Sequence, residues 1–356
     1  MRNSSADRVC SCMSFLVIFL ISLFSSVALT GAFRSVALRT HLLDIPVSRS
    51  AHKTPVPVGG GVVLVCILLF AVISLYLSKR MGFPEFMAFG GALLIAIVGF
   101  VDDIKELPIN WRIIPQLACS TWAVWWLGGI PEIDFLGFTL STTWLLNGLG
   151  IIALLWLVNL YNFMDGIDGI AVSELVFVNV MSLLFVIKFP NSEVFLLSLV
   201  SLGAACGFLM WNWAPAKIFM GDVGSGFIGF VIGLLAIITL HHGLMTVWTW
   251  LILLAVFVVD TLVTLFRRFL AGKKWYQGHA SHAYQKAAKH FNSHQKVTIT
   301  VMLINVLWLS PLAWCSMEYP NLGIVMTVIA IVPLLVLAFF LEAGKDEAIG
   351  LANELA

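Results

Sequence analysis

Apolar residues occur in long, nearly unbroken runs along most of the chain, and short polar segments separate these runs. The hydrocarbon core of a bilayer is about 30 Å thick, so a helix that crosses it needs roughly 20 mostly apolar residues. About eleven runs approach this length, at residues 13–30, 58–77, 84–101, 112–128, 143–160, 168–188, 193–211, 226–240, 246–266, 297–315 and 321–341. The pattern predicts an all-α polytopic membrane protein with about eleven transmembrane helices.

The composition agrees with a chain that lipid covers. Hydrophobic residues make up 60% of the 356 residues and charged residues only 11%, with a mean hydropathy of +0.99, whereas a soluble domain carries about 25% charged residues. The net charge of +1 gives no reason to expect a nucleic-acid partner. The six cysteines are scattered, mostly within apolar runs, which indicates small buried side chains rather than a disulfide framework. We expect one integral membrane domain over residues 1–356.

The distribution of Lys and Arg predicts the orientation. Most of these residues lie in segments 31–57 and 267–296, which fall on one side of the membrane, whereas the loops of the other side carry Lys79, Arg80 and Lys188. Cytoplasmic loops are the ones enriched in Lys and Arg. We therefore expect the N-terminus outside and the C-terminus in the cytoplasm.

The first apolar run allows a second interpretation. Arg2 and Arg8 precede it and small residues follow it, which is also the arrangement of a cleaved signal peptide. The run is long for a signal peptide, so we expect a retained helix, although these two arginines count against an external N-terminus.

Acidic residues gather in three short, Gly-flanked loops that the predicted topology places in the cytoplasm: Asp102 and Asp103, Asp165 and Asp168, and Asp222. A single aspartate at a helix end is often only an N-cap. Five acids on one side would repel one another unless a cation lay between them. Mg²⁺ prefers one or two carboxylates together with substrate phosphates, so the loops favour a Mg²⁺ site, with Mn²⁺ as an alternative.

Glycines flank these acids, as Gly166 and Gly169 in one loop and as Gly221, Gly224 and Gly226 in another. Glycine permits tight turns and close approach of a ligand to the backbone. Helix N-termini that follow such turns present free N–H groups to anions. Small residues also pack membrane helices against one another, so the glycines alone remain weak support for an anion site.

Two basic segments belong to the same predicted side. The last large loop contains Arg and Lys pairs, followed by His279-Ala-Ser-His282-Ala-Tyr-Gln, and Lys53 precedes the second apolar run. Juxtamembrane Lys and Arg commonly bind anionic lipids. Imidazoles beside cations and opposite carboxylates suit phosphate binding or proton transfer.

These motifs together resemble those of the polyprenyl-phosphate N-acetylhexosamine-1-phosphate transferases, the bacterial glycosyltransferase family 4. The motifs appear in the family's order as Thr-Pro-Val-Pro-Val-Gly-Gly, Asp-Asp, Asn-Leu-Tyr-Asn-Phe-Met-Asp-Gly-Ile-Asp-Gly and Gly-Asp-Val-Gly-Ser. The resemblance extends from Lys53 to Gln285. It implies a multi-pass enzyme of the bacterial inner membrane with a cytoplasmic active site.

The resemblance implies a role for each matching residue. Asp222 and Asn162 match the Mg²⁺ positions, and Asp102 and Asp103 match the catalytic pair. Lys53 matches a basic residue on the lipid-phosphate side. The nucleotide-sugar positions are matched by Asp165, Gly166, Asp168, Arg112, His279 and His282.

One motif departs from the commoner family pattern. Many bacterial members have His-x-His-His in the last cytoplasmic loop, where this chain has His279-Ala-Ser-His282 followed by Ala-Tyr-Gln. This form resembles the O-antigen initiating branch, which handles 6-deoxy sugars such as N-acetylfucosamine or N-acetylquinovosamine.

The reaction that this resemblance implies is transfer of an N-acetylhexosamine-1-phosphate from its UDP-sugar to undecaprenyl phosphate, with release of UMP. The product would begin an O-antigen or another cell-envelope polysaccharide. Direct attack by the lipid phosphate and a covalent aspartyl intermediate both remain open. Expected partners are UDP-N-acetylhexosamine, undecaprenyl phosphate and membrane lipids, with monomer and homodimer both open and no nucleic acid.

Two other functions compete with this one. A cation-coupled transporter or flippase would also use intramembrane acids, but such sites lie near the bilayer midplane, not at helix ends on one side. A non-catalytic scaffold would not need intact acids in all three loops.

Overall fold

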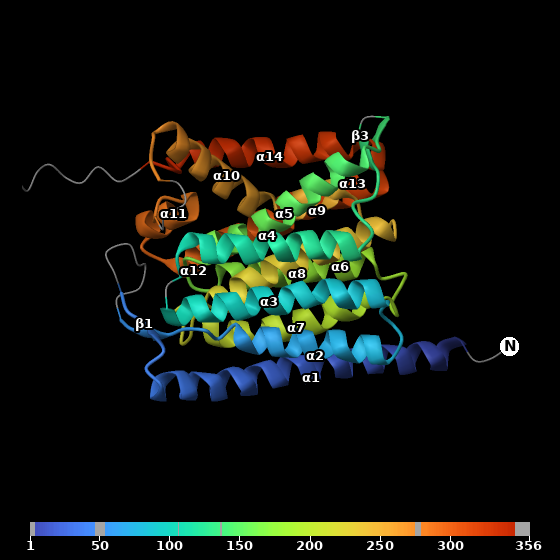
Figure 1. The fold of residues 1–356 in the computed structure, drawn as a ribbon, viewed down its shortest axis with the longest axis horizontal. Coiled ribbons are helices and arrows are strands. Elements are labelled where there is room, and N and C mark those ends of the chain that lie inside the picture. Colours follow the sequence, from blue (N-terminus) through green and yellow to red (C-terminus); the bar gives the residue numbers. More distant parts are fainter. Residues whose placement is uncertain (1–3, 47–53, 106, 136, 275–278, 346–356) are drawn as a thin grey trace, which may run out of the picture.

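Helices occupy every apolar run of the sequence (Figure 1). The computed structural model describes residues 4–46, 54–105, 107–135, 137–274 and 279–345. The helices are α1 (Ser4–Arg39), α2 (Val62–Leu77), α3 (Phe83–Lys105), α4 (Ile109–Trp126), α5 (Thr143–Met164), α6 (Ile170–Phe185), α7 (Glu193–Asn212), α8 (Asp222–His241), α9 (Val247–Leu253), α10 (Ala255–Leu270), α11 (Ala283–Phe291), α12 (His294–Ile304), α13 (Ser310–Glu318) and α14 (Gly323–Phe340). A π-helix, η1 (Asn305–Leu309), joins α12 to α13, and a 3₁₀ turn, η2 (Pro320–Leu322), precedes α14.

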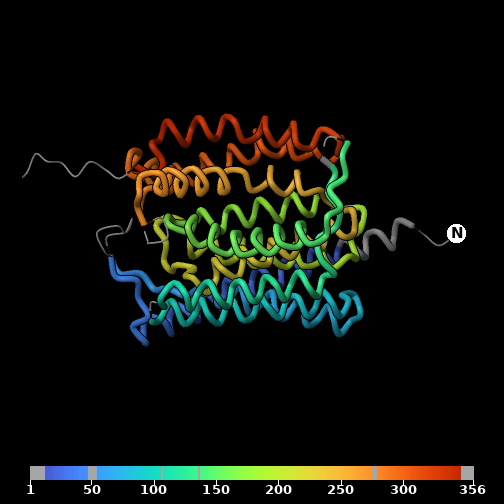
Figure 2. The backbone as a smooth tube through the Cα atoms, turned by 45° about the horizontal axis from the view of Figure 1, so that its top comes forward, coloured from blue at the N-terminus to red at the C-terminus, as the bar shows by residue number. Residues whose placement is uncertain are grey.

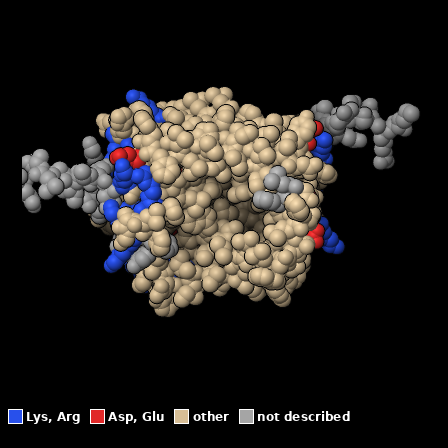
Figure 3. Space-filling view, turned by 90° about the horizontal axis from the view of Figure 1, so that it is seen from above, with Lys and Arg blue, Asp and Glu red and all other residues tan. Residues whose placement is uncertain are grey.

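The helices have the length and composition of membrane spans. Within the described residues, seven helical stretches are long and apolar enough to cross a bilayer, and the bent pair of α9 and α10 adds an eighth if it forms one span. Helices α2 and α6 are equally apolar but shorter. In the space-filling view of Figure 3, Lys and Arg gather at the two ends of the molecule and leave an uncharged band between them. The protein is therefore an α-helical, polytopic membrane protein.

Two of the predicted runs are not straight helices. Residues 246–266 form α9 and α10, whose axes differ by 76°, with the break at Leu254. No Gly or Pro stands at this break to reveal it in the sequence. Residues 297–315 contain η1, which lies just before Pro311. Proline lacks the N–H that would continue an α-helix, and so favours a local change of helical pitch.

The loops that carry the sequence motifs all lie at one end of the bundle, at the left of Figure 1, where α3 ends and α4, α6, α8 and α12 begin. Helix α1 begins at the opposite end and α14 ends at the motif end. Figure 2 shows the same bundle turned by 45°, with the red α14 at its top.

The segment that precedes α2 forms backbone hydrogen bonds with the segment that precedes α8. Strands β1 (Leu43–Asp44) and β2 (Val56–Pro57) form an antiparallel pair. The Phe219 N–H donates to the Pro57 carbonyl at 2.8 Å, and the Gly61 N–H donates to the Met220 carbonyl at 2.8 Å. A Cβ at Gly61 would lie 2.3 Å from the Cα of Gly224. These two glycines therefore permit contact between backbones, which is a packing role.

A second hairpin closes the opposite end. Strands β3 (Ile133–Phe135) and β4 (Phe138–Leu140) pair between α4 and α5. The Trp248 indole donates to the Asp134 carbonyl at 3.1 Å and so joins this hairpin to α9.

Helix α1 packs closely against α7 through small residues. A Cβ at Gly203 would lie 2.6 Å from a backbone carbonyl oxygen of α1, and one at Gly207 would lie 2.4 Å from the Leu23 carbonyl oxygen. The Ser26 hydroxyl donates to the Ala204 carbonyl at 2.7 Å. Small residues four positions apart are typical of close helix contacts in membranes. Helix α1 is thus packed against the bundle in the structure.

The α1–α7 contact yields a stability prediction. Substitution Gly207→Val should lower the free energy of unfolding by about 1–3 kcal/mol, because the added atoms overlap the backbone of α1. Thermal unfolding of the detergent-purified protein measures the effect. The matched control is Gly148→Ala in α5, where a Cβ meets nothing within 4 Å. A Gly207→Val protein that melts with the wild type would contradict this packing role.

Candidate active site

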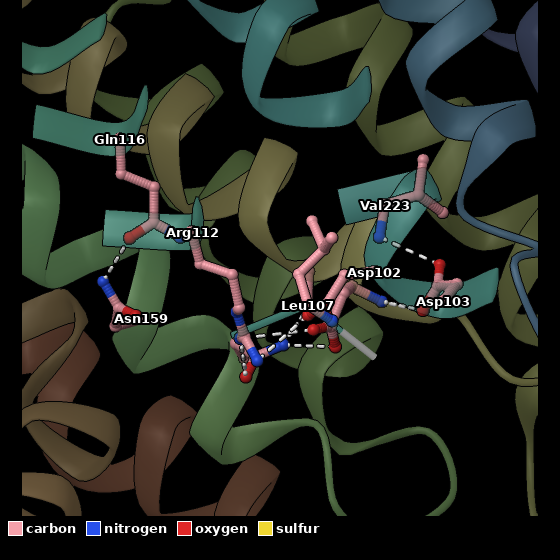
Figure 4. A network of polar contacts seen from close by, with 10 residues as sticks. Asp102, Asp103, Leu107, Arg112, Gln116, Asn159 and Val223 are labelled. Atoms are coloured by element: carbon pink, nitrogen blue, oxygen red, sulfur yellow. Dashed lines mark hydrogen bonds and ion pairs between the residues drawn. The ribbon is translucent and has the colours of Figure 1, made fainter. Parts of the chain in front are cut away.

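Four helix ends meet at the motif end of the bundle and bring together Asp102, Arg112, Asn162 and Asp222. Figure 4 shows Arg112 beside Asp102, with Asp103 facing the start of α8 at Val223. The Arg112 guanidinium lies between two carboxylates, with Nη1 at 3.0 Å from Asp102 Oδ2 and Nη2 at 3.2 Å from Asp222 Oδ2. The Asn162 amide donates to Asp222 Oδ1 at 2.5 Å and accepts from Arg112 Nη2 at 3.3 Å. The sequence therefore identified four residues that the fold places in one cluster.

A glycine in α3 allows this convergence. A Cβ at Gly99 would lie 2.5 Å from the Asp222 carbonyl oxygen, so any larger residue would push α3 away from the start of α8. Asp102 lies one turn after Gly99, in the last turn of α3. The close approach of the two backbones thus brings Asp102 and Asp222 within reach of the same arginine.

The two neighbouring aspartates of α3 have different surroundings. Asp103 Oδ1 accepts from the Asp222 N–H at 2.7 Å, and its Oδ2 accepts from the Val223 N–H at 3.1 Å. Asp103 therefore caps the N-terminus of α8, where a negative charge is favourable. Asp102 instead accepts from the Leu107 N–H at 2.6 Å and faces Arg112. The sequence predicted one catalytic pair, and the structure gives its two members different partners.

A narrow cavity of about 20 Å³ opens beside Arg112, and a volume of this size holds about one water molecule. Its lining consists of Asp102, Arg112, Gln116, Asn162 and Asp222, with Ile95, Val98, Gly99, Val158 and Gly226 on the apolar side. Gln116, a residue that the sequence analysis did not identify, is buried in α4 and accepts from the Asn159 amide at 2.8 Å. Gln116 could have been noticed in the sequence, because a polar amide within an apolar run must find a hydrogen-bond partner.

Asp165 ends α5 beside this cluster. The pKa of Asp165 is raised well above its usual range, first by burial among protein atoms and then by the charges of Asp222, Asp103 and Asp168. The Asp165 side chain is half-buried from solvent. A carboxylate in these surroundings requires a proton or a cation nearby.

Gly166 lies against the histidine-containing loop. A Cβ at Gly166 would lie 2.2 Å from the Tyr284 hydroxyl oxygen, so a larger residue would have to displace the Tyr284 side chain. The Tyr284 hydroxyl donates to the Phe163 carbonyl at 2.8 Å. Burial, followed by the charges of Asp260 and Asp165, raises the pKa of Tyr284 well above its usual value, which keeps the phenol protonated and able to donate.

Asp168 has its partners in other segments than the cluster around Arg112. Its carboxylate accepts from the Ala216 N–H at 3.0 Å and lies 3.3 Å from His294 Nδ1. The Asp168 carbonyl accepts from the Thr298 hydroxyl at 3.1 Å. In the structure this residue joins the start of α6 to α12 and to the segment before α8.

His279 and His282 lie together, with ring centroids 5.0 Å apart and nearly parallel planes. His279 is half-buried, whereas His282 is only 2% exposed. His282 Nδ1 lies 3.1 Å from a carboxylate oxygen of Asp260 in α10. The sequence analysis missed Asp260 because it treated residues 246–266 as one apolar span, although an ionisable residue inside a span is itself a signal of function.

Lys53, predicted on the lipid-phosphate side, lies outside the described residues. Among the other glycines of the motifs, Gly169 and Gly221 have positive φ angles of 75° and 76°. Both positions therefore need the conformational freedom of glycine. The Gly169 N–H donates to the Asn212 side chain at 3.2 Å, so this turn is held by protein contacts.

The side chains of the cluster provide oxygen donors for a hard cation. No group of three or more His, Cys, Asp or Glu side chains suited to a metal ion occurs among the described residues. The cluster instead offers two carboxylates, Asp102 and Asp222, with the amide of Asn162 beside them. Mg²⁺ commonly uses one or two carboxylates and takes its remaining ligands from water and substrate phosphates, so this donor set fits Mg²⁺ and does not fit Zn²⁺.

Comparison with known proteins agrees with this geometry. Residues 85–240 match the family model described as glycosyl transferase family 4, and this range includes the whole cluster. A Bacillus subtilis (strain 168) protein, described as a probable undecaprenyl-phosphate N-acetylglucosaminyl 1-phosphate transferase, is 27% identical over 302 residues, which cover 82% of each chain.

Two streptococcal relatives are described as phospho-N-acetylmuramoyl-pentapeptide-transferases. The one from Streptococcus pneumoniae (strain CGSP14) is 32% identical over 263 residues, 69% of this chain and 77% of the relative. The one from Streptococcus agalactiae serotype Ia (strain A909) is 29% identical over 234 residues, 60% and 67% of the two chains. The protein therefore belongs to glycosyl transferase family 4, the superfamily of enzymes that transfer a sugar-1-phosphate to a polyprenyl phosphate.

Proposed function

We propose that this enzyme transfers an N-acetylhexosamine-1-phosphate from a UDP-sugar to undecaprenyl phosphate and releases UMP. The observation that carries the proposal is the cluster of Asp102, Arg112, Asn162 and Asp222 at the end of a membrane bundle. Phosphoryl transfer depends mainly on positioning and on neutralising charge, and this cluster combines carboxylates for a metal ion with a guanidinium for a phosphate. The undecaprenyl phosphate named in the Bacillus relative supports the lipid acceptor.

The enzyme is proposed as one domain, residues 1–356, in the bacterial inner membrane. We propose eleven spans, with α9 and α10 as one bent span and α12 to α13 as another. The N-terminus then lies outside, and the C-terminus and the site lie in the cytoplasm. The position of the motif loops and of most Lys and Arg side chains at one end supports this orientation (Figure 3). UDP-sugars are soluble, so a site at the membrane surface also gives both substrates access.

Asp222 and Asn162 are the proposed Mg²⁺ ligands, with Mn²⁺ as a substitute. The bound ion would neutralise charge on the pyrophosphate and on the departing UMP. A transporter or flippase would be expected to hold its cation near the bilayer midplane. The acids of this cluster lie in the first or last turn of their helices, which favours the transferase.

In the proposed reaction an oxygen of the lipid phosphate attacks the β-phosphorus of the UDP-sugar. The bond from the β-phosphorus to the bridging oxygen breaks, and UMP leaves with that electron pair. Asp102 is the member of the aspartate pair that faces the cavity, so we assign it to orienting the lipid phosphate and, where the phosphate carries a proton, to accepting it. Asp103 supports catalysis by capping α8 and so positioning Asp222.

The remaining matched residues are proposed to hold the substrates. Arg112 would contact the pyrophosphate, and Asp165 and Gly166 would line the nucleotide-sugar site beside His279 and His282. Asp168 would act by fixing the same loop through its bond to the Ala216 N–H. Lys53 is proposed to bind the lipid phosphate.

The metal role of Asp222 can be tested with an isosteric substitution. Asp222→Asn should lower UMP release about 10²- to 10³-fold, because the site loses a charge that it directs at the reacting phosphates. Purified protein, UDP-sugar, undecaprenyl phosphate and Mg²⁺ suffice for the assay, and binding of Mg²⁺ should weaken in parallel.

Asp134→Asn is the control, since Asp134 is an exposed aspartate at the opposite end of the bundle. The control should keep wild-type activity. Full UMP release by Asp222→Asn would refute the metal assignment.

Arg112 should also affect how strongly Mg²⁺ stabilises the protein. Arg112→Met removes the positive charge between Asp102 and Asp222, so the metal-free variant should unfold at a lower temperature than the wild type. Added Mg²⁺ should raise the melting temperature of the variant more than that of the wild type, because the ion supplies the missing charge.

The control for this measurement is Arg80→Met, which removes an exposed arginine at the opposite end. It should respond to Mg²⁺ as the wild type does. Equal Mg²⁺ responses of Arg112→Met and the wild type would contradict the placement of the ion at Asp222, beside the charge that Arg112 supplies.

The sugar is proposed to be an N-acetylhexosamine, with a 6-deoxy sugar such as N-acetylfucosamine or N-acetylquinovosamine as the specific form, and the product to begin an O-antigen or related envelope polysaccharide. The tyrosine and glutamine after His282 both approach Gly166, so this variant of the histidine motif lies beside the proposed sugar position. UMP release should be fastest with a UDP-6-deoxy-N-acetylhexosamine in a panel that includes UDP-N-acetylglucosamine. Preference for UDP-MurNAc-pentapeptide would contradict this substrate assignment.

A further inference from the structure

An acid outside all the sequence motifs lies within α10. Asp260 is only 5% exposed and is surrounded by apolar residues of a membrane helix. Such a residue is costly to bury unless donors surround it. The structure supplies these donors from a different part of the chain.

The Asp260 carboxylate accepts four hydrogen bonds. Its Oδ1 accepts from the Ala283 N–H at 2.9 Å, and from the Thr264 hydroxyl at 3.1 Å. Its Oδ2 accepts from the Tyr284 N–H at 2.9 Å. The fourth contact joins Oδ1 to His282 Nδ1 at 3.1 Å. Asp260 therefore holds the first turn of α11 from a neighbouring helix.

This carboxylate also holds the His282 ring in place. His282 Nδ1 lies 3.1 Å from Asp260 Oδ1, and the His282 side chain also accepts the backbone N–H of Gln285 in the first turn of α11. A carboxylate bonded to a histidine commonly fixes the orientation of its ring.

The same first turn reaches the cluster through Tyr284. The Tyr284 N–H donates to Asp260, and the Tyr284 hydroxyl donates to the Phe163 carbonyl. Phe163 lies in the last turn of α5, just before the loop that contains Gly166. The His282 ring stacks on the His279 ring, and the centroid of the His282 ring lies 6.1 Å from that of the Phe163 ring. A displacement of the first turn of α11 would therefore move both histidines relative to Asp165 and Gly166.

We propose that Asp260 is a positioning residue for the nucleotide-sugar site: it fixes the ring orientation of His282 and the position of Tyr284, and so sets affinity for the UDP-sugar without contacting it. The inference rests on the proposed function. It goes beyond the sequence motifs, none of which includes Asp260.

The first test is steady-state kinetics of Asp260→Asn with the UDP-sugar that the wild type uses best. An asparagine offers one oxygen in place of two, so at least one contact to Ala283, Tyr284 or His282 is lost. The KM for the UDP-sugar should rise about tenfold, whereas the KM for undecaprenyl phosphate stays within about twofold. A general folding defect would instead lower the amount of active enzyme and leave both KM values unchanged.

The second test reads the anchoring of α11 without any substrate. Lys286 and Lys289 lie in α11, and trypsin should cleave there several-fold faster in Asp260→Asn than in the wild type, because the first turn has lost its cap. The matched control is Glu174→Gln, which changes another buried acid of a membrane helix. Glu174 binds Asn305, away from the histidine loop, so this variant should retain wild-type KM values and cleavage rates.

Asp260→Glu keeps the charge but moves the carboxylate by one methylene. It should show a smaller rise in the KM for the UDP-sugar, and it decides the question if Asp260→Asn does not accumulate as folded protein. Unchanged KM and unchanged cleavage in the folded variant would overturn the proposal. If no UDP-sugar releases UMP with the wild type, the proposed function fails, while the cleavage assay still reports whether Asp260 anchors α11.

Discussion

The contact of Arg112 with two carboxylates is the interaction on which the motif end of the bundle depends. Asp102 and Asp222 belong to different helices, and their charges would drive these helices apart in surroundings that water screens poorly. One guanidinium, 3.0 and 3.2 Å from the two carboxylates, offsets that repulsion. Its planar fork reaches both acids at once, which the single ammonium group of a lysine would do less well.

This arrangement divides the acids into two groups. Asp103 and Asp168 have their oxygens directed at backbone N–H groups, so their role is to hold α8 and the preceding segment in place. Asp102 and Asp222 instead pair with the Arg112 guanidinium, and Asp165 lies close enough to Asp222 for that charge to raise its pKa. These three acids are thus the ones that would bind a cation together with substrate phosphates. Asp260 extends the first group, because it secures the histidine loop in the same manner.

The sequence was informative where physical requirements are local. Apolar runs located the helices because lipid demands a minimum length of apolar residues. The Gly-flanked loops located Asp102 and Asp222, whereas Asn162 and Arg112 were identified only through the resemblance to the transferase family. It was uninformative where the requirement comes from a distant segment. Asp102 and Asp103 are adjacent and chemically identical, and only the position of α8 separates their roles. Likewise, nothing in the sequence around Leu254 indicates the 76° bend between α9 and α10. The role of Asp260 becomes visible only when the structure places α11 against it.

The contact between α1 and α7 has a consequence for biosynthesis. The Ser26 hydroxyl and the Ala204 carbonyl that it binds are separated by 178 residues. At about 5–20 residues per second, a ribosome needs roughly 10 to 35 seconds to make the chain between them. During that interval the face of α1 that later packs against Gly203 and Gly207 of α7 is not covered by α7. The first helix must therefore wait in lipid, or beside the insertion machinery, until α7 enters the membrane and completes its partner surface.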